Sequence, residues 1–364
     1  MRIFQNNRYY PALRRRLRDF TSHRSGFEGM MDAFLSFRES AAHVLLPVDQ
    51  RLECAFFANG TDAEAQRVWA VEHGLSSRTP LSEILRSQIE EHCTEVFYNL
   101  DVTSWEADFA KRLPGCVKKR VAWHAAPFKG ISFLGYDLVV CNFPSILAQL
   151  SNQGYRTEYF TPAHDPKLAS FAARQDRPID VLFVGGYSRH HARRAKMLEA
   201  VAALSGEYNI VYHLDRSRLC RLAESPLGYL LPLGKHRRPT KVAAIARPPA
   251  FGLDLYDLMS KAKIVLNGAI DMAGPDRGNM RCFEALGSSA LLLSDDGVYP
   301  EGMRDGETIV TYKSPGEAVE RIRDALEGAP QTRLTIAAAG YHMVSTRYSK
   351  SEQWQRFEAL VAAI

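Results

Sequence analysis

The feature that most constrains the fold is an alternation of short apolar runs with amphipathic stretches, beginning near residue 43. Strands that alternate with helices of this length pair in parallel, because each connection must cross back over a face of the sheet. The strands expected in the first half are HVLLPV (43–48), CAFFA (54–58), EVFYNL (95–100), KRVAW (119–123), YDLVVC (136–141) and RTEYF (156–160). Helices are expected at 84–92, at 104–112 and from Pro144 onward.

The same alternation restarts after TPAHDPKLASFAARQDRP (161–178), which is rich in Pro, Ala and charged residues and is the expected linker. The later strands are expected at 179–184, 208–213, 264–267, 290–294 and 308–312, with helices at 193–205, 256–262, 283–287, 315–327 and 351–364. A chain of 364 residues exceeds what one core usually serves. The predicted fold class is α/β, with two facing Rossmann-like doubly wound domains and an interdomain cleft.

The expected division of the chain has four parts. They are a basic helical N-terminal extension (1–40), a first domain (41–165), a second domain (175–345) and a closing helix (346–364). In open parallel sheets, ligands bind outside the carboxyl ends of the strands. Functional side chains are therefore expected in the loops that follow strands.

Composition excludes several classes of protein. Apolar residues make up 46% of the chain and charged residues 24%, which excludes disordered, collagen-like and disulfide-scaffold proteins. A net charge of +5 gives no support to a nucleic-acid partner. The six cysteines are scattered singly, without a C-x-x-C pair, as expected for reduced thiols in a cytoplasmic protein. No apolar run approaches the roughly 18 residues that cross a bilayer.

Residues 1–24 carry seven arginines against the single acid Asp19, with apolar residues interleaved. Two interpretations stay open. Such a basic amphipathic segment can lie on an anionic membrane surface, which would make the protein membrane-peripheral. Alternatively, its apolar stripe packs on its own domain and its arginines face solvent.

The first loop with candidate chemistry runs from Val184 to Arg194 (VGGYSRHHARR), between a strand and a helix. Gly185 and Gly186 allow close approach of the backbone, and Arg189, Arg193 and Arg194 are the candidates to attract an anion at the helix N-terminus. The loop lacks the spacing of G-x-G-x-x-G and of the P-loop. It predicts a diphosphate site; the alternative is a tight turn with a solvated basic helix.

The second loop follows Asn267 and is rich in glycine, and a helix after it carries Arg281 and Glu284 three residues apart. A carboxylate can accept two hydrogen bonds from vicinal hydroxyls such as those of a ribose, and Arg281 can neutralise phosphate. The alternative is a surface salt bridge.

These segments carry a resemblance to a known family. DVLFVGGYS, GLDLYDLMSKAKIVLN and R-x-F-E-A-x-G at 281–287 resemble glycosyltransferases of the GT-B fold, group 1 type, as found in proteins similar to the spore maturation protein CgeB. WHAAP, YDLVVCN and TPAHDP carry it more weakly in the first half. The resemblance implies a nucleotide-sugar donor in the second domain, a saccharide or glycoconjugate acceptor in the first, and a role in cell-surface polysaccharide or glycoconjugate synthesis. It implies no cofactor besides this donor substrate.

The resemblance also assigns roles to residues. It implies that Gly185, Gly186, Arg189, Arg193, Asn267, Arg281 and Glu284 bind the donor. Many members carry an acidic pair E-x7-E; its second position matches Glu284, whereas its first falls on the shorter Asp276, a departure that leaves its catalytic role and a retaining mechanism open. The chain contains no D-x-D, with which another glycosyltransferase fold holds a metal, so no metal is expected.

His124 follows the strand KRVAW and is the candidate general base in the first domain, or else a structural histidine. Asp49 and Asp101 also fall near expected strand ends, so the base is not assigned uniquely. His164 and Asp165 are expected to fix the linker. Two other classes of function remain open: a non-catalytic GT-B-like binding or assembly protein, and a nucleotide-sugar 2-epimerase.

Overall fold

In the computed structural model the chain divides into two compact units. Unit 1 comprises Met1–Ala163 and Lys350–Ile364, and unit 2 comprises His164–Ser349. The structure describes residues 1–8, 13, 17, 26–126, 130–187, 191–216, 218–269 and 274–364, without the side chains of Tyr229 and Lys235. Each unit is described separately below.

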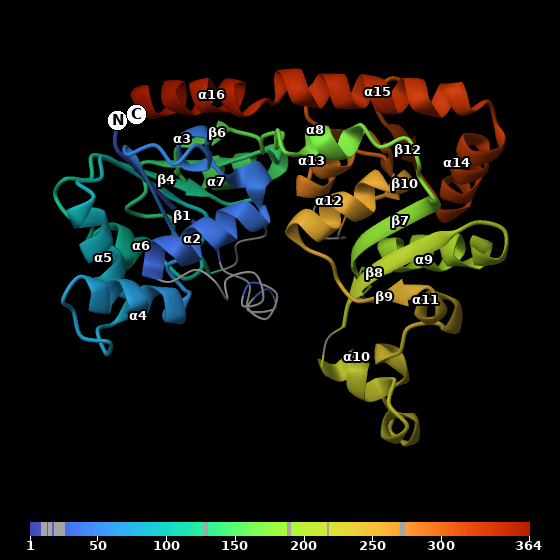
Figure 1. The fold of residues 1–364 in the computed structure, drawn as a ribbon, viewed down its shortest axis with the longest axis horizontal. Helices are drawn as coiled ribbons and strands as arrows, with labels where there is room; N and C mark the ends of the chain where they lie inside the picture. Colours follow the sequence, from blue (N-terminus) through green and yellow to red (C-terminus); the bar gives the residue numbers. More distant parts are fainter. Residues whose placement is uncertain are drawn as a thin grey trace. The chain divides into compact units, whose positions relative to one another are not determined.

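Unit 1 is built on a parallel sheet of six strands in the order β2-β1-β3-β4-β5-β6. Figure 1 labels β1, β4 and β6 of this sheet. The strands are β1 (Ile3–Asn6), β2 (Ala55–Ala58), β3 (Val96–Asn99), β4 (Lys119–Trp123), β5 (Leu138–Cys141) and β6 (Thr157–Tyr159). The helices are α2 (Gly26–Phe37), α3 (Leu46–Asp49), α4 (Ala63–Glu72), α5 (Leu81–Glu91), α6 (Ala107–Ala110), α7 (Pro144–Asn152) and α16 (Lys350–Ala362), with a 3-10 turn at Ala41–His43.

Alternating side chains of this sheet pack on opposite faces. Val121 and Val140 lie in the same core cluster as Phe357 and Val361 of α16. Their chain neighbours Ala122 and Val139 lie instead in a cluster with residues of α7. Helices therefore cover both faces, as expected for strands that are apolar on both sides.

Unit 2 has a second parallel sheet of six strands, in the order β12-β11-β10-β7-β8-β9. The strands are β7 (Ile179–Gly186), β8 (Ile210–Asp215), β9 (Ala246–Arg247), β10 (Ala262–Leu266), β11 (Leu291–Asp295) and β12 (Val310–Tyr312). The helices are α8 (Leu168–Ala172), α9 (Ala192–Ala202), α10 (Arg218–Ala223), α11 (Thr240–Ala244), α12 (Gly252–Ser260), α13 (Met280–Gly287), α14 (Pro315–Glu327) and α15 (Pro330–Arg347), with 3-10 turns at Ala203–Gly206, Leu227–Leu230 and Gly234–His236.

The sheet of unit 2 is also covered on both faces. Leu182 and Val265 pack in one cluster with α12, α13 and α15. Val181 and Ile264 pack in the other with α9, α11 and α14. The predicted class, an α/β fold of two Rossmann-like sheet units, is confirmed.

The N-terminal segment differs from the expected helical extension. Residues Ile3–Asn6 form β1, which lies between β2 and β3 inside the first sheet. The strand is stabilised by two fully buried apolar side chains, Ile3 and Phe4, and by amide pairs such as Asn6 Nδ2 donating to Asn99 Oδ1 over 2.8 Å. Leu13 and Leu17 are buried too. Most of 9–25 lies outside the described residues, so both interpretations of the basic segment stay open.

A second difference concerns 43–48, expected as a strand. This stretch contains a 3-10 turn and the start of α3, because Pro47 occupies the first turn of that helix, where its missing N–H costs nothing. Asp49 consequently lies on a helix, paired with Arg38 at 2.6 Å, and does not follow a strand. Within the described ranges, no helix is both long and apolar enough to cross a membrane.

Candidate functional site

Strand order places a crevice at one point of each sheet. In unit 2 the first strand, β7, has β8 on one side and β10 on the other. The chain therefore runs from β7 to β8 and β9 on one side, and then crosses back to β10, β11 and β12 on the other side. This is the order of dinucleotide-binding folds, in which ligands bind where the connections diverge. In unit 1 the corresponding point lies between β1 and β3.

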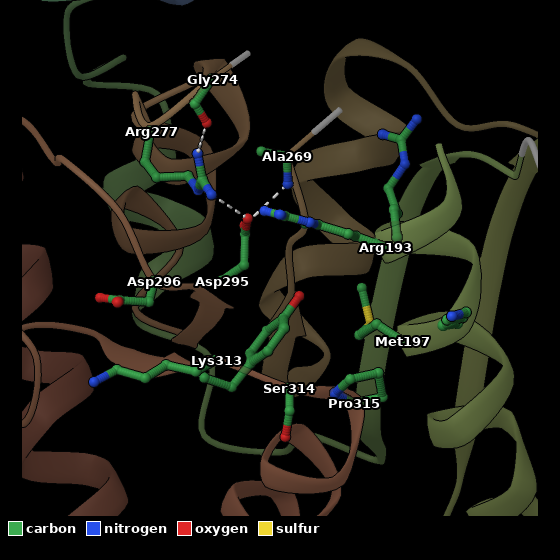
Figure 2. A pocket seen from close by; sticks show the side chains of 14 residues that line it. Arg193, Met197, Ala269, Gly274, Arg277, Asp295, Asp296, Lys313, Ser314 and Pro315 are labelled. Atoms are coloured by element: carbon green, nitrogen blue, oxygen red, sulfur yellow. Dashed lines mark hydrogen bonds and ion pairs between the residues drawn. The ribbon is translucent and has the colours of Figure 1, made fainter. Parts of the chain in front are cut away.

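A cavity of about 450 Å³ lies at this point in unit 2, a volume typical of small-molecule sites (Figure 2). Segments following β10, β11 and β12 line it, together with the start of α9, which follows β7. Its charged lining residues are Arg193, Arg194, Lys196, Arg277, Lys313, Asp295 and Asp296. With five cations against two carboxylates among the described lining residues, the cavity favours an anionic ligand.

Asp295 organises the centre of the cavity. Arg277 pairs with its carboxylate at 2.7 Å, and the backbone N–H of Ala269 donates to it at 2.9 Å, as Figure 2 shows. Arg277 also donates to the carbonyl of Gly274 at 2.9 Å. These bonds fix the guanidinium at the cavity wall and tie the loop after β10 to the end of β11.

Backbone bonds hold the Asp276–Arg277 segment in place. Arg277 N donates to Val298 O at 2.8 Å and Val298 N donates to Pro275 O at 2.9 Å. At Gly297 an added Cβ would lie 2.5 Å from Pro275 O, so the close approach requires glycine. The Asp276 side chain is buried, and Asp276 is not among the residues lining the cavity.

Asn267 acts as a framework residue beside the cavity. Its Nδ2 donates to Ser294 Oγ at 3.0 Å, its Oδ1 accepts from Asn279 Nδ2 at 3.3 Å, and its carbonyl accepts from Tyr312 OH at 2.8 Å. Burial raises the pKa of Tyr312 well above its usual value, so its hydroxyl remains a donor. These bonds connect the carboxyl ends of three strands to the N-terminus of α13.

Arg281 and Glu284 lie on α13, as expected, and form an ion pair at 2.6 Å. The Glu284 side chain is 5% exposed and that of Arg281 19%, so the pair is not a solvated surface bridge. Burial raises the pKa of Glu284; the charge of Arg281 opposes this shift and that of Asp165 adds to it. Asp165 in turn accepts a hydrogen bond from Tyr256 at 2.9 Å.

The structure brings only some of the predicted donor residues to the cavity. Arg193 lines it, and Asn267 immediately precedes the lining residues Gly268 and Ala269. Gly185 and Gly186 end β7, beside β8, and are not lining residues. Arg189 lies outside the described residues. The roles of these residues stay predictions.

The sequence analysis missed Arg277, Asp295, Tyr312 and Lys313. Signals for them were present: Arg277 directly follows Asp276, and Asp295 directly follows the predicted strand ALLLS. Among the described side chains, no three of His, Cys, Asp or Glu gather where they could hold a metal ion.

His124 lies in unit 1 and lines a separate cavity of about 210 Å³. This cavity lies at the carboxyl ends of the neighbouring strands β1 and β3, where the connections of the sheet run in opposite directions. Asn7, which follows β1, and Thr103, which lies beyond the end of β3, both line it. The ring of His124 meets that of Phe133 edge to face, with centroids 5.4 Å apart. Asp101, two residues before the lining residue Thr103, is buried and accepts a hydrogen bond from Thr103 Oγ1 at 3.0 Å.

Comparison with known proteins agrees with this arrangement. Residues 193–359 match the model of a family described as glycosyl transferase-like. The segment covers less than half of the chain but contains most of the unit 2 cavity. No curated protein sequence matches the chain.

Solved structures show the fold. HepE from Anabaena, crystallised with UDP and glucose, matches with a TM-score of 0.59 at 14% identity over 100% of this chain and 99% of that one. A glycosyltransferase from Rickettsia africae matches with 0.57 at 10% over 99% and 97%, and sucrose-phosphate synthase from Thermosynechococcus elongatus with 0.51 at 13% over 78% of each. The protein has the GT-B fold.

Proposed function

We propose that the protein is a glycosyltransferase that moves a sugar from a nucleotide-sugar donor, held by unit 2, to a saccharide or glycoconjugate acceptor. The observation that carries the proposal is the cationic cavity where the connections of the second sheet diverge, within the segment that matches a glycosyl transferase-like family. HepE of Anabaena, which shares the fold, has been crystallised with UDP-glucose.

In this proposal the cations of the cavity neutralise the donor diphosphate and stabilise the departing nucleotide. Preorganised charge of this kind acts where negative charge develops and is often the largest single contribution to catalysis. Arg193 and Arg277 are the residues we assign to it. The chemistry then requires no metal, and the product would serve cell-surface polysaccharide or glycoconjugate synthesis.

We assign Glu284 to bind the ribose hydroxyls of the donor. Arg281 is assigned to orient the Glu284 carboxylate and to keep it charged. Ionised Glu284 accepts two hydrogen bonds, and a buried carboxylate gives strong ones. Because burial raises the pKa of Glu284, the charge of Arg281 at 2.6 Å helps to keep it ionised.

The first experiment is a thermal-shift screen against UDP-, GDP-, ADP-, CMP- and dTDP-linked sugars. A ligand at about 100 times its dissociation constant stabilises the folded state by about 2.7 kcal/mol. Calorimetry with the best donor then compares Glu284→Ala and Arg281→Ala with the wild type, and we expect affinity to fall about tenfold or more.

The matched control is the pair Arg304 and Glu307, which has the same residue types and the same spacing but is solvent exposed. Arg304→Ala and Glu307→Ala should leave donor affinity unchanged. Equal donor affinities in the wild type and all four variants would refute the assignment of Arg281 and Glu284 to the donor site. Release of free nucleotide from a radiolabelled donor would exclude a non-catalytic protein, and an altered sugar on an intact nucleotide would indicate an epimerase instead.

A further inference from the structure

An unusual concentration of exposed leucines lies in unit 2, between β8 and β9. Twelve large hydrophobic side chains are exposed in the described part of the chain, and five of them fall between residues 219 and 231. We call these five the leucine platform: Leu219, Leu222, Leu227, Leu230 and Leu231, with exposed fractions of 49%, 43%, 70%, 83% and 46%. They lie on α10 and the turn after it, which project from the end of the sheet (Figure 1).

The platform is held by a folded segment. Glu224 pairs with Arg216 at 2.7 Å and with Arg238 at 2.6 Å, which closes the segment at both ends. Arg237 donates to the carbonyls of Ala223 and Gly228 from within. The leucines are thus carried on a backbone that is held by hydrogen bonds and ion pairs to its own neighbours.

Gly228 shows how closely the segment packs. An added Cβ at Gly228 would lie 1.9 Å from the carbonyl oxygen of Leu222, so the turn rests directly on α10. Burial alone would raise the pKa of Glu224, but hydrogen bonds from Arg238 and Cys220, together with the charge of Arg238, lower it to about 2. The Glu224 carboxylate that pairs with Arg216 and Arg238 is therefore ionised at neutral pH.

Cations outnumber acids in the segment that carries the platform. Residues 216–241 contain seven Arg and Lys residues, and Glu224, already held by two arginines, is the single acid. Arg218, Arg221 and Lys241 are exposed. Exposed apolar side chains that gather in one short segment can mark an interaction surface, and in this segment exposed cations are interspersed with them.

We infer that the leucine platform docks the protein on an anionic lipid surface, independently of the function proposed above. Leucines enter the boundary between headgroups and acyl chains, while arginine and lysine beside them contact lipid phosphates. A protein interface is the weaker match, since the cores of such interfaces are enriched in aromatic residues and depleted of charge. The occupant is therefore a membrane leaflet rich in anionic phospholipid.

The test is co-sedimentation of the full chain with vesicles of phosphatidylcholine alone and of phosphatidylcholine with phosphatidylglycerol. The wild type should bind the second kind and release it as salt increases. Arg218→Gln with Arg221→Gln should weaken binding about 25-fold, at about fivefold for each charge. Leu227→Ser with Leu230→Ser should weaken it about tenfold or more.

Controls separate docking from general effects. Leu134→Ser removes a leucine of similar exposure, 58%, from unit 1 and should bind like the wild type. Arg14→Gln, Arg15→Gln and Arg16→Gln together test the N-terminal membrane contact, one of the two interpretations of the basic segment left open by the sequence. Thermal unfolding of each variant establishes that it is folded.

Four results would overturn the inference. The wild type could fail to bind phosphatidylglycerol vesicles, or folded platform variants could bind as well as it does. Loss of binding in the N-terminal variant alone would place the contact there. A wild-type dimer that ignores vesicles and becomes monomeric in the platform variants would make the surface a protein interface.

Discussion

The two units share one architecture and differ in the side chains at the divergence point of each sheet, the place where successive connections run in opposite directions. In unit 2 the cavity is lined by Arg193, Arg277 and three further cations. In unit 1 the cavity at the same topological place is lined by His43, Trp123 and His124, and Arg8 is the one Arg or Lys among the lining residues that the structure describes. The fold determines where a ligand binds, and the side chains determine which ligand. In the proposed function, this difference corresponds to a diphosphate in unit 2 and a hydroxylated acceptor in unit 1.

The largest predicted effect concerns the pair at the centre of the cationic cavity. Arg277→Ala leaves Asp295 without its cation and should lower the free energy of unfolding of unit 2 by about 3 kcal/mol. All four tryptophans, Trp69, Trp105, Trp123 and Trp354, belong to unit 1. Urea unfolding followed by circular dichroism should therefore show the loss, while tryptophan fluorescence shows the transition of unit 1 unmoved.

Two variants control that measurement. Arg323→Ala removes an exposed ion pair of unit 2, Arg323 with Glu207, and should cost less than about 1 kcal/mol. Asp295→Asn should restore part of the loss when combined with Arg277→Ala. Equal losses from Arg277→Ala and Arg323→Ala would show that the central pair has no special role.

The next effect separates binding from chemistry. If His124 is the general base of unit 1, His124→Asn should lower turnover of the donor found by the screen about 100-fold and leave nucleotide affinity unchanged. Glu284→Ala should do the opposite and lower affinity first. His73→Asn, a surface histidine of unit 1, is the control. Loss of nucleotide affinity in His124→Asn would contradict the assignment of the two units.

The smallest predicted effect is a difference in acid stability. Burial, assisted by Lys350, lowers the pKa of His43 to about 4, and burial assisted by Arg2 does the same for His92. Both lie in unit 1. Between about pH 6.5 and pH 4 the unfolded chain binds more protons than the folded one at these sites, so stability falls as the pH falls. We expect a loss of about 1 kcal/mol or more for each histidine, seen by tryptophan fluorescence.

His92→Gln should flatten this pH dependence, and His73→Gln should not. A transition of unit 1 that does not change with pH across this window would show that neither imidazole is kept neutral by the fold.

The sequence analysis located most strands, because their apolar runs reflect burial on both faces. It missed β1, where only Ile3 and Phe4 are apolar and the strand is completed by buried amides. Their partners, such as Asn99, lie far along the chain, and no local pattern shows such a pair. The predicted linker likewise contains α8, whose Leu168 is buried, and α15 was not expected.

Glycine-rich loops after strands indicated Arg193, Arg281 and Glu284. Arg193 lines the cavity, whereas Arg281 and Glu284 lie on α13 and are not lining residues, so their donor-binding roles stay predictions. The Arg277–Asp295 pair joins the loop after β10 to the end of β11, and neither residue indicates the other in sequence. Strand order, which defines the divergence point, also emerges only from the assembled sheet.

Hydrogen–deuterium exchange of the full chain, with and without the nucleoside diphosphate chosen by the thermal-shift screen, tests the central claim most directly. We expect the nucleotide to slow exchange in peptides that cover 191–202, which contains α9, and 274–287, which runs from the cavity wall through α13. Exchange in peptides of unit 1 at 100–108 and 119–126 should stay unchanged. Protection at the strand ends of unit 1, with none in unit 2, would contradict it.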